Sequence, residues 1–314
     1  MADYLVTGGA GFIGSKVAEA LLARGDRVII IDNLSTGHEA NVPAGAVFIK
    51  SDCQDAQVYK ELSGRKFDAI FHIAGQSSGE ISFDDPVYDL RSNTESTLCL
   101  LKFALNSGCR RFIYASTMSV YGQHDPEAPV NENCVCNPLS FYAVGKIASE
   151  HYLRIYQKYG IQSTSLRLFN VYGPGQNLEN LRQGMVSIYM TQMIKGRHIV
   201  VKGSLERFRD FIYIDDVVKS FLLCLDIKET EGKVINVGTG IKTTVGNLLR
   251  IMFEIYNKDI AVVQEGSTPG DITGITADIT LLKKLTSFNP EISLRDGLTR
   301  MIQWASKEYG YRNT

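Results

Sequence analysis

Short runs of β-branched and aromatic residues alternate with amphipathic helical stretches from residue 3 to about residue 170 of this chain. Such apolar runs are typical of strands that are buried on both faces of a parallel sheet. Repeated units of strand, helix and strand predict a doubly wound α/β sheet. The expected strands are residues 4–6, 27–31, 47–49, 69–73, 111–115 and 163–166, and the clearest helices between them are 13–24 and 87–107.

The alternation loosens after about residue 170, where the segment 173–177 contains two glycines and an asparagine. Helices are expected near 184–194, 216–225, 245–256 and 294–309, with short strands between them. No linker of low complexity separates this region from the first. We therefore predict two domains, residues 1–170 and a smaller α/β lobe of residues 171–314, with chain crossovers between them and a shared cleft.

The charge balance argues against nucleic acid or an acidic membrane surface as the partner. The chain has 33 Lys and Arg against 34 Asp and Glu among its 314 residues, a formal net charge of -1, and no block of like charges. A small molecule is the expected partner. No apolar run reaches the roughly 18 residues of a membrane span, and the N-terminus lacks the features of a secretory signal. We therefore expect a cytoplasmic protein.

The six cysteines are scattered, and only Cys134 and Cys136 lie close together in the sequence. No second pair and no histidine cluster completes a set of zinc ligands. We expect reduced thiols and no bound metal.

Three glycines, Gly8, Gly11 and Gly14, follow the first expected strand and open the first helix. Glycine at these positions permits a tight turn and lets the backbone touch a pyrophosphate, and the helix N-terminus supplies N–H donors. Such a turn can also serve packing alone. Asp32, which ends the second strand, decides between the two because an acid there accepts hydrogen bonds from a ribose. Asn33 follows it instead of a cation that would balance a 2'-phosphate, so NAD is favoured over NADP.

Tyr142 and Lys146 are four residues apart at the start of an expected helix that runs to about residue 159, so they share one helical face. A lysine ammonium, together with a positive nicotinamide ring, would lower the pKa of the phenol and allow proton exchange with a substrate hydroxyl. Surface residues have the same spacing in many helices, and the dinucleotide turn upstream favours the catalytic interpretation. Thr117 lies at the C-terminal end of a buried strand, where open α/β sheets bind ligands.

These motifs resemble those of the extended short-chain dehydrogenase/reductase family, and within it those of nucleotide-sugar epimerases and dehydratases. The resemblance covers nearly the whole chain. It implies a Rossmann fold that binds NAD, a C-terminal lobe that binds a nucleotide diphosphate sugar, and a homodimer. The motifs are TGGAGFIG from Thr7, DNLSTG from Asp32, Asp52, HIAGQSS from His72, Asn93, STMSVYG from Ser116, YAVGK from Tyr142, LRLFNVYGPGQ from Leu166, RDFIYIDDV from Arg209 and NVGTG from Asn236.

The resemblance also implies roles for single residues, and Thr117, Tyr142 and Lys146 match the catalytic trio. Asn170 and Arg209 match positions that hold the sugar diphosphate, where a guanidinium suits phosphate oxygens. The residues expected to bind NAD are Gly8, Gly11, Phe12, Ile13, Gly14, Asp32, Asn33, Ser35, Thr36, Gly37, Asp52, Cys53, Ile73, Ala74, Gly75, Gln76, Asn93, Tyr142, Lys146, Leu168 and Val171. Those expected to bind the nucleotide sugar are Thr117, Ser119, Asn170, Arg182, Arg209 and Asp271.

The two residues after Thr117 favour one reaction within this group. In the family, dehydratases that make 6-deoxy-4-keto sugars place an Asp-Glu pair there, and decarboxylating relatives place a Glu at the second position, whereas this chain has Met118 and Ser119. Neither side chain can serve as the acid or base of an elimination. The resemblance is closest to UDP-glucose and UDP-N-acetylglucosamine 4-epimerases, which oxidise C4 of the sugar with NAD and return the hydride to its other face.

Other functions stay open at this stage. Elimination to a 5,6-unsaturated sugar is the alternative from another reaction class. A 4-keto reduction would need exchangeable NADPH, against which Asp32 argues, and a non-enzymatic dinucleotide sensor would tend to lack Tyr142 and Lys146.

Two departures from the family pattern bear on the sugar site. Thr268 stands where the family motif Arg-x-Gly-Asp has its diphosphate-gripping arginine, a loss of about 1.5 to 3 kcal/mol. Arg182 or Arg207 is the candidate replacement, with a solvated surface charge as the alternative. Glu80 stands where many epimerases carry a basic or apolar residue, and it is either an unexpected acid or a loop charge.

The implied dimer would join helices 87–107 and 141–159 of each chain. Apolar side chains on these helices either form that interface or pack inside one chain. The candidates are Leu98, Leu101, Leu105, Tyr152, Ile155 and Tyr156.

Overall fold

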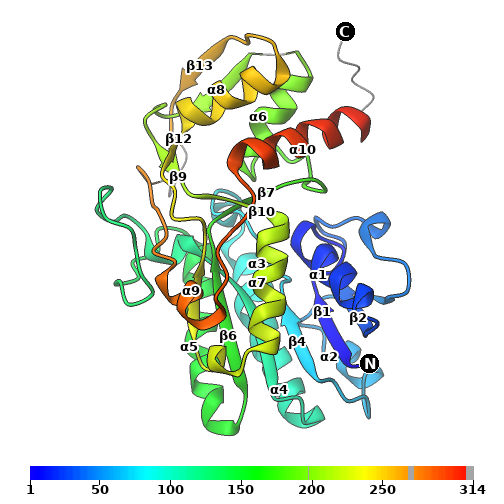
Figure 1. Cartoon of the computed structure of the whole chain (residues 1–314). Coiled ribbons are helices and arrows are strands. Elements are labelled where there is room, and N and C mark those ends of the chain that lie inside the picture. The colour runs from blue at the N-terminus through cyan, green and yellow to red at the C-terminus, as the bar shows by residue number, and fades with distance from the viewer. Residues whose placement is uncertain (197, 268–271, 309–314) are drawn as a thin grey trace.

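The computed structural model describes residues 1–196, 198–267 and 272–308, and its largest element is a seven-stranded parallel sheet (Figure 1). The strand order is β11-β6-β5-β4-β1-β2-β3. The chain therefore starts in the middle at β1, runs outward to β3 and then reverses to β4, which makes a switch point between β1 and β4. The predicted doubly wound α/β fold is confirmed. The strands of this sheet are β1 (Asp3–Thr7), β2 (Arg27–Asp32), β3 (Val47–Lys50), β4 (Ala69–His72), β5 (Arg111–Thr117), β6 (Gln162–Leu168) and β11 (Val234–Val237).

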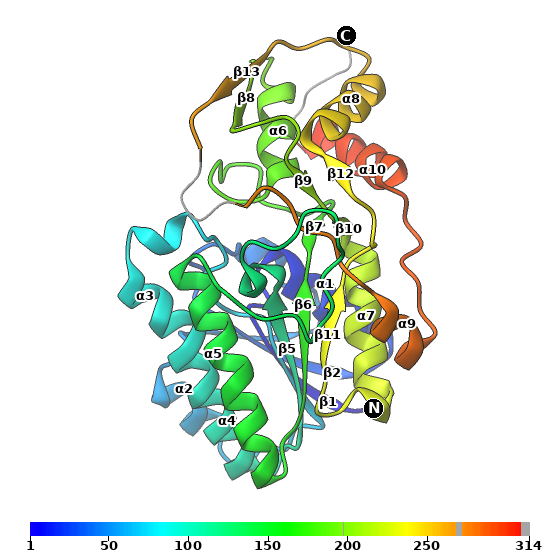
Figure 2. The same cartoon turned by 90° about the vertical axis from the view of Figure 1, so that its left-hand side faces the viewer.

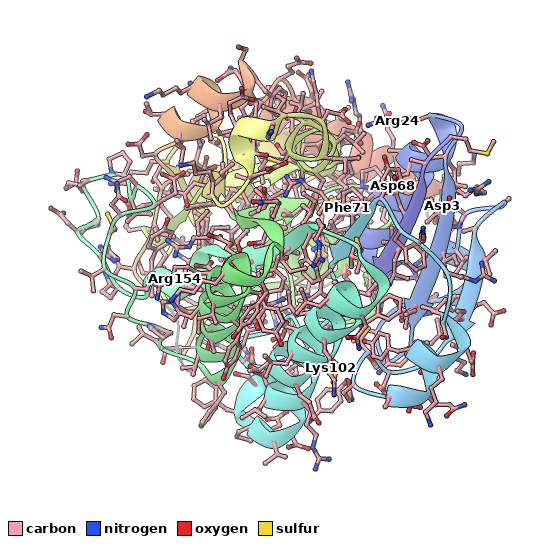
Figure 3. All side chains as sticks on the ribbon, turned by 90° about the horizontal axis from the view of Figure 1, so that it is seen from below. Asp3, Arg24, Asp68, Phe71, Lys102 and Arg154 are labelled. Atoms are coloured by element: carbon pink, nitrogen blue, oxygen red, sulfur yellow. The ribbon has the colours of Figure 1, made fainter. Side chains whose placement is uncertain are left out.

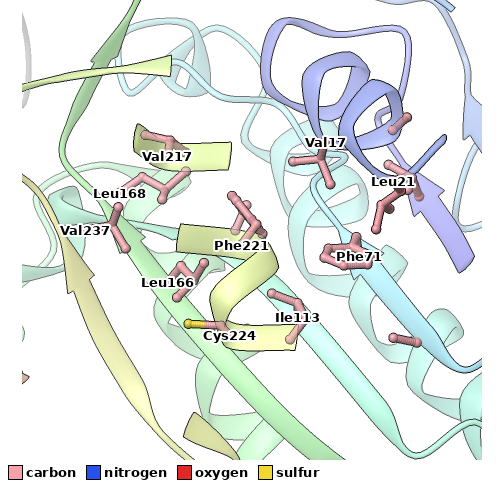
Figure 4. Close-up of a cluster of buried hydrophobic side chains, with 14 of the residues drawn as sticks. Val17, Leu21, Phe71, Ile113, Leu166, Leu168, Val217, Phe221, Cys224 and Val237 are labelled. Carbon is pink, nitrogen blue, oxygen red and sulfur yellow. The ribbon is translucent and has the colours of Figure 1, made fainter. Parts of the chain in front are cut away.

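Helices cover both faces of this sheet (Figure 2). On one face the side chains of Val17 and Phe221 meet strand residues such as Phe71, Ile113 and Leu166 in a buried apolar cluster (Figure 4). A second cluster fills the opposite face, with Leu100 and Leu153 against strand residues. The helices are α1 (Phe12–Ala23), α7 (Ile214–Asp226) and α9 (Thr280–Thr286) on the first face, and α2 (Ala56–Glu61), α4 (Ser96–Ser107) and α5 (Phe141–Tyr156) on the second.

The single helix predicted over residues 87–107 is interrupted. The structure has α3 (Pro86–Leu90), then a π-helical turn (Arg91–Glu95), then α4. Asp85 caps α3 by accepting a hydrogen bond from the N–H of Tyr88 at 2.9 Å, and Pro86 at the first turn fixes the start. A π turn inserts one extra residue into the helix, and the side chain of Asn93 in this turn is fully buried.

The smaller lobe lies above the sheet in Figure 1 and has its own apolar core. Its strands form three two-stranded sheets, β7 (Asn170–Tyr172) with β10 (Phe211–Tyr213), β8 (Ile199–Lys202) with β13 (Val262–Glu265), and β9 (Phe208–Arg209) with β12 (Thr243–Thr244). Its helices are α6 (Met185–Ile194), α8 (Val245–Tyr256) and α10 (Leu294–Glu308).

The C-terminal part of the chain also returns to the large sheet through α7, β11 and α9. Crossovers of this kind are what the sequence predicts, whereas the domain boundary near residue 170 stays a prediction.

The two ends of the large sheet are distinguished by the smaller lobe, which lies at only one of them. From the end opposite the smaller lobe, Asp3 and Asp68 lie at the starts of β1 and β4, and Lys102 and Arg154 lie on α4 and α5 (Figure 3). The carboxyl ends of the strands point toward the smaller lobe, so ligands of an open α/β sheet are expected there. Among the helices that the structure describes, none is both long and apolar enough to cross a membrane.

Candidate active site

Three adjoining cavities lie at the carboxyl ends of the strands. The glycine-turn cavity is lined by the turn after β1 and the end of β2, the tyrosine cavity by Thr117, Tyr142 and Lys146, and the arginine cavity by Arg182, Arg207 and Arg209. Ser77 and Gln183 line all three. The cavities therefore form one continuous cleft between the sheet and the smaller lobe.

Glycine is required at positions in this turn because neighbouring backbone atoms leave no room for a Cβ. A Cβ on Gly8, which has φ +73°, would lie 2.7 Å from the amide nitrogen of Ala74, and a Cβ on Gly14 would overlap the carbonyl group of Gly8. Gly11 is the N-cap of α1, and its only close neighbour would be the Gly8 carbonyl oxygen at 3.2 Å. The turn brings the N-terminus of α1 to the cavity, where the first N–H groups of a helix lack intrahelical partners and favour phosphate.

Asp32 ties the end of β2 to the glycine turn. Its carboxylate accepts backbone hydrogen bonds from Ala10 at 3.0 Å and Leu34 at 2.8 Å, and it also lines the glycine-turn cavity. Asn33 donates to the carboxylate of Asp52 at 2.6 Å. Among the described residues that line this cavity there is no lysine or arginine.

Most of the predicted cofactor residues meet at these cavities. The glycine-turn cavity is lined by Gly8, Gly11, Phe12, Ile13, Gly14, Asp32, Asn33, Ser35, Thr36, Asp52, Cys53, Ile73, Ala74 and Gly75, and the tyrosine cavity adds Tyr142, Lys146, Leu168 and Val171. Gly37 lies behind the first cavity, packed so closely that a Cβ would stand 2.8 Å from the carbonyl of Ala10. Gln76 and Asn93 also lie behind the cavity linings.

The predicted catalytic trio comes from two elements. Thr117 ends β5, and Tyr142 and Lys146 lie on one face of α5, whose N-cap Ser140 accepts a hydrogen bond from the N–H of Ala143 at 3.2 Å. All three side chains are buried and line the tyrosine cavity. The Lys146 ammonium donates to the carbonyl of Ala115 at 3.0 Å and lies 5.8 Å from the centre of the Tyr142 ring.

The chain's own groups, taken together, raise the pKa of Tyr142, in contrast to the lowering expected from Lys146. Burial raises the pKa of the Tyr142 phenol to about 12, with a hydrogen bond to Thr117 acting in the opposite direction. Burial also lowers the pKa of the Lys146 ammonium to about 8. The lowering of the Tyr142 pKa therefore depends on the positive charge of a nicotinamide ring.

The arginine cavity combines cations with polar groups. Arg209 is buried in β9, where burial and the neighbouring Arg207 lower the pKa of its guanidinium to about 10. Asn170 lines both this cavity and the tyrosine cavity, and its side-chain amide donates to the carbonyl of Asp210 at 3.2 Å. Ser119 also lines both cavities. An anionic ligand matches this electropositive wall.

Arg182 already has two carboxylate partners. Its guanidinium lies 2.5 Å from Asp84 and 3.3 Å from Glu80, and Lys202 contacts the same Glu80 at 3.3 Å. These pairs join the segment after β4 to the smaller lobe at the mouth of the cleft. Glu80 is thus an ion-pairing loop residue that lines the arginine cavity. Asp271 and Thr268, which the sequence analysis places at the diphosphate, lie outside the described residues.

Several lining residues are not singled out by the sequence. His38, Asn41, Tyr88, Ser92 and Asn180 line the glycine-turn cavity. They come from loops, from a 3-10 turn (Glu39–Asn41), from α3 and from the π turn, where no periodic pattern indicates which side chain faces a ligand. Most of these positions lie outside the family motifs.

The family assignment follows from comparison with known proteins. A family model described as the NAD dependent epimerase/dehydratase family matches residues 4–238. The chain belongs to this family. The match spans the glycine turn, Thr117, Tyr142 and Lys146, and it confirms the resemblance drawn from the motifs.

Relatives within the NAD-dependent epimerase/dehydratase family match along the full chain. UDP-glucose 4-epimerase of Mycolicibacterium smegmatis is 32% identical over 96% of this chain and 97% of its own. The structure of Thermotoga maritima UDP-glucose 4-epimerase with UDP-glucose has a TM-score of 0.94, with 34% identity over 98% of this chain and 99% of that one. The structure of Bacillus cereus UDP-glucuronic acid 4-epimerase with UDP-glucuronic acid and NAD has a TM-score of 0.90, with 29% identity over 98% and 100%.

NAD is the cofactor of this family, and the residues present fit it. The glycine turn presents a helix N-terminus to the cavity, and Asp32 lies at the end of the next strand. The described lining lacks the cation that a 2'-phosphate would need. The fit is therefore to NAD.

His72 links the sheet to the helices behind this site and predicts a pH dependence of stability. It is fully buried, with Nδ1 2.8 Å from the hydroxyl of Thr7 and Nε2 3.0 Å from that of Thr97. Burial, reinforced by the charge of Lys146, holds the pKa of His72 well below its usual value. Below about pH 6.5 the unfolded chain binds a proton at this residue that the folded chain does not, so stability falls as pH falls, by up to about 1.4 kcal/mol per pH unit.

Chemical denaturation between pH 5 and 7 measures this slope. The variant His72→Gln is expected to show a smaller loss of unfolding free energy toward pH 5 than the unmodified protein. Equal slopes in the two proteins would contradict the assignment of a neutral buried His72.

Proposed function

We propose that this protein is an NAD-dependent 4-epimerase of a UDP-hexose of the UDP-glucose or UDP-N-acetylglucosamine type, acting through a transient 4-keto sugar. The observation that carries the proposal is the composition of the tyrosine cavity. Among the described residues that line it, Tyr142 and Thr117 are placed to handle a hydroxyl, and there is no carboxylate. Elimination of water across C5 and C6 needs an acid and a base at that end of the sugar. Oxidation and re-reduction at C4 need only the groups present.

NAD would be held by the glycine turn, Asp32 and the walls of the tyrosine cavity, and when bound it supplies reversible hydride transfer at C4. Tyr142 would take the proton of the C4 hydroxyl as that carbon is oxidised and return it on reduction. Thr117 would hold the same oxygen by its hydrogen bond. Lys146, anchored on the carbonyl of Ala115 at 3.0 Å, would add its charge to that of the nicotinamide ring, which is the contribution that favours the phenolate.

The UDP part is proposed to lie in the arginine cavity. Arg209 and Asn170 are the groups best placed to hold the diphosphate there, because both line that cavity and Arg209 is buried with its charge near Arg207. Arg182 is less suited to this role since Asp84 and Glu80 neutralise it. Epimerisation requires the keto sugar to turn while the diphosphate stays fixed, and the continuity of the arginine and tyrosine cavities supports such a movement.

Proton NMR of the purified protein, without added cofactor, tests this proposal. The samples contain UDP-glucose, UDP-N-acetylglucosamine or UDP-glucuronate. Galacto-configured signals that approach a stable ratio with the starting sugar are expected, and the responding sample identifies the sugar. An olefinic signal or a new methyl doublet would instead establish dehydration and contradict epimerisation.

A homodimer is also proposed, through a surface on α3, α5 and the segment before α3. Leu101, Leu105, Tyr152 and Tyr156, named above as candidates for this interface, pack in the apolar core of their own chain. Of the other two candidates, Ile155 is exposed and Leu98 is half-buried. Further exposed apolar side chains lie on α3, just before it and at the start of α5. They are Phe83, Val87, Leu90, Phe141 and Val144, and the rings of Phe83 and Phe141 are in edge contact at 5.5 Å. An exposed apolar group of this kind supports a protein–protein interface.

The variant Val144→Glu is expected to convert the dimer to a monomer, because it places a charge in the middle of an apolar interface. Val135→Glu is the matched control, since Val135 is a similarly exposed valine in a loop. Sedimentation velocity measures the oligomeric state of both variants and of the unmodified protein. A monomeric unmodified protein, or a dimer that survives Val144→Glu, would overturn the proposed surface.

A cytoplasmic location is proposed as well. Six free thiols suit a reducing compartment.

A further inference from the structure

Asp89 is a buried acid behind the tyrosine cavity that the proposed mechanism does not use. It lies on the short helix α3, and only 1% of it is exposed. A buried carboxylate is costly unless hydrogen bonds or an opposite charge compensate it. Its neighbours therefore indicate what it does.

One oxygen of Asp89 holds the turn that follows β4. Oδ2 accepts hydrogen bonds from the side-chain amide of Gln76 at 2.9 Å and from that of Asn93 at 3.3 Å. Asn93 in turn donates to the carbonyl of Gln76 at 2.9 Å. Gly75, the preceding residue, lines both the glycine-turn cavity and the tyrosine cavity. Asp89 thus fixes, through two amides, a turn that forms the wall of the cofactor site.

The other oxygen faces α5. Oδ1 is buried and has no hydrogen-bond partner among the described residues. It lies 3.5 Å from the position that a Cβ on Gly145 would occupy, next to Lys146 in the chain. Lys146 Nζ in turn lies 3.4 Å from the position of a Cβ on Gly75, beside the turn that Asp89 holds. The acid and the ammonium therefore flank the same turn from two sides.

The ionisable groups near Lys146 and Asp89 set the charge environment of this part of the site. Lys146 lies 5.8 Å from the centre of the Tyr142 ring on α5 and 5.0 Å from that of Tyr114 on β5, and its charge acts on the neutral buried His72 on β4. The charge of Asp89 raises the pKa of Lys146, opposing the effect of burial, and it also raises the pKa of Tyr142. Glu150, a buried acid on α5, is paired with Arg167 at 2.7 Å.

We propose that Asp89 is a positioning residue of the active site, which holds the Gly75–Gln76 turn against the cofactor and supplies the buried negative charge that keeps the Lys146 ammonium in place. The inference rests on the proposed function for its catalytic meaning. Its electrostatic part concerns Lys146 alone and can be measured without turnover.

The variant Asp89→Asn removes the charge and keeps the shape. The titration of Lys146 is followed by 13C NMR of labelled lysine in the NAD-loaded protein, with the signal assigned by its loss in Lys146→Met. The midpoint is expected to fall by about one pH unit, the size of effect that a nearby opposite charge has. The alkaline limb of the pH–rate profile is expected to move down by the same amount, because Lys146 then loses its proton at lower pH.

Two further variants separate charge from structure. Glu95→Gln removes an exposed acid from the π turn that follows α3 and is expected to leave the Lys146 titration unchanged. Gln76→Met keeps the Asp89 charge but removes a donor to Asp89, together with the hydrogen bonds between the Gln76 amide and Ser78. It is expected to release NAD faster than the unmodified protein with the Lys146 midpoint unchanged. This variant also tests the positioning role if Asp89→Asn fails to fold.

An unchanged Lys146 midpoint in a folded Asp89→Asn protein would overturn the electrostatic role. NAD release from Gln76→Met at the unmodified rate would overturn the positioning role. Failure of the proposed function has a different signature, since no UDP-sugar would then be converted while the Lys146 titration still shifted.

Discussion

Replacing Tyr142 with phenylalanine is expected to lower turnover of the UDP-sugar by about 10²- to 10⁴-fold, the usual contribution of a positioned proton donor and acceptor. Tyr142 is buried and lines the tyrosine cavity together with Thr117. The change removes one hydroxyl and keeps the ring, so NAD is expected to remain bound. Initial rates and the NAD content of the purified protein are the two measurements.

Tyr152→Phe is the matched control. Tyr152 lies on the same helix, but its ring packs against the apolar cluster that contains Leu100 and Leu153. It is expected to retain nearly full activity. A Tyr142→Phe protein that keeps its NAD and still turns over within a few fold of the unmodified rate would remove Tyr142 from the mechanism.

Replacing Gly14 with alanine is expected to destabilise the protein by about 3 kcal/mol and to abolish NAD retention. Alanine is favoured over glycine inside a helix by about 1 kcal/mol, and Gly14 lies in α1. The new Cβ, however, would overlap the carbonyl oxygen of Gly8 and stand 2.7 Å from its carbon. Both neighbours are backbone atoms, so the turn itself must move, and overpacking of this kind outweighs the helical gain.

Gly25→Ala is the control at the other end of the same helix. A Cβ there would meet nothing within 4 Å, and only the φ of +84° opposes it, at a cost of about 1 kcal/mol. Thermal melting and the absorbance of bound NAD are measured for both variants. A Gly14→Ala protein that melts like the unmodified one and retains NAD would show that the turn is not the rigid element described here.

Much of the fold could be predicted because the buried strands are recognisable in the sequence as short runs of apolar, β-branched residues. The run at 27–31 consists almost wholly of β-branched residues, and the structure places β2 at Arg27–Asp32. The π turn at Arg91–Glu95 could not be predicted, since these five residues are polar and include no glycine or proline that would mark a break in the helix. Asn93 in this turn is buried and donates to the carbonyl of Gln76, a tertiary contact. Local sequence does not encode such a contact.

The cofactor side of the site could be predicted from the sequence more fully than the side that contains Arg182. Asp32 and the glycine turn follow from chemistry at fixed spacing, and they line one cavity as expected. The pairing of Arg182 with Asp84 and Glu80 joins residues about 100 positions apart. Their approach depends on how the smaller lobe packs on the sheet, which spacing along the chain does not determine. Asp89 was missed for the same reason, because its partners come from three separate elements.

The most direct test of the central claim uses UDP-glucose, or the sugar that the NMR panel selects, with deuterium at C4. Epimerisation removes the label from C4 and returns it to the opposite face of the same carbon. The prediction is a C4 epimer that retains the deuterium at C4, formed without added cofactor. A product with the deuterium at C6, or one that has lost it to solvent, would contradict epimerisation by this protein.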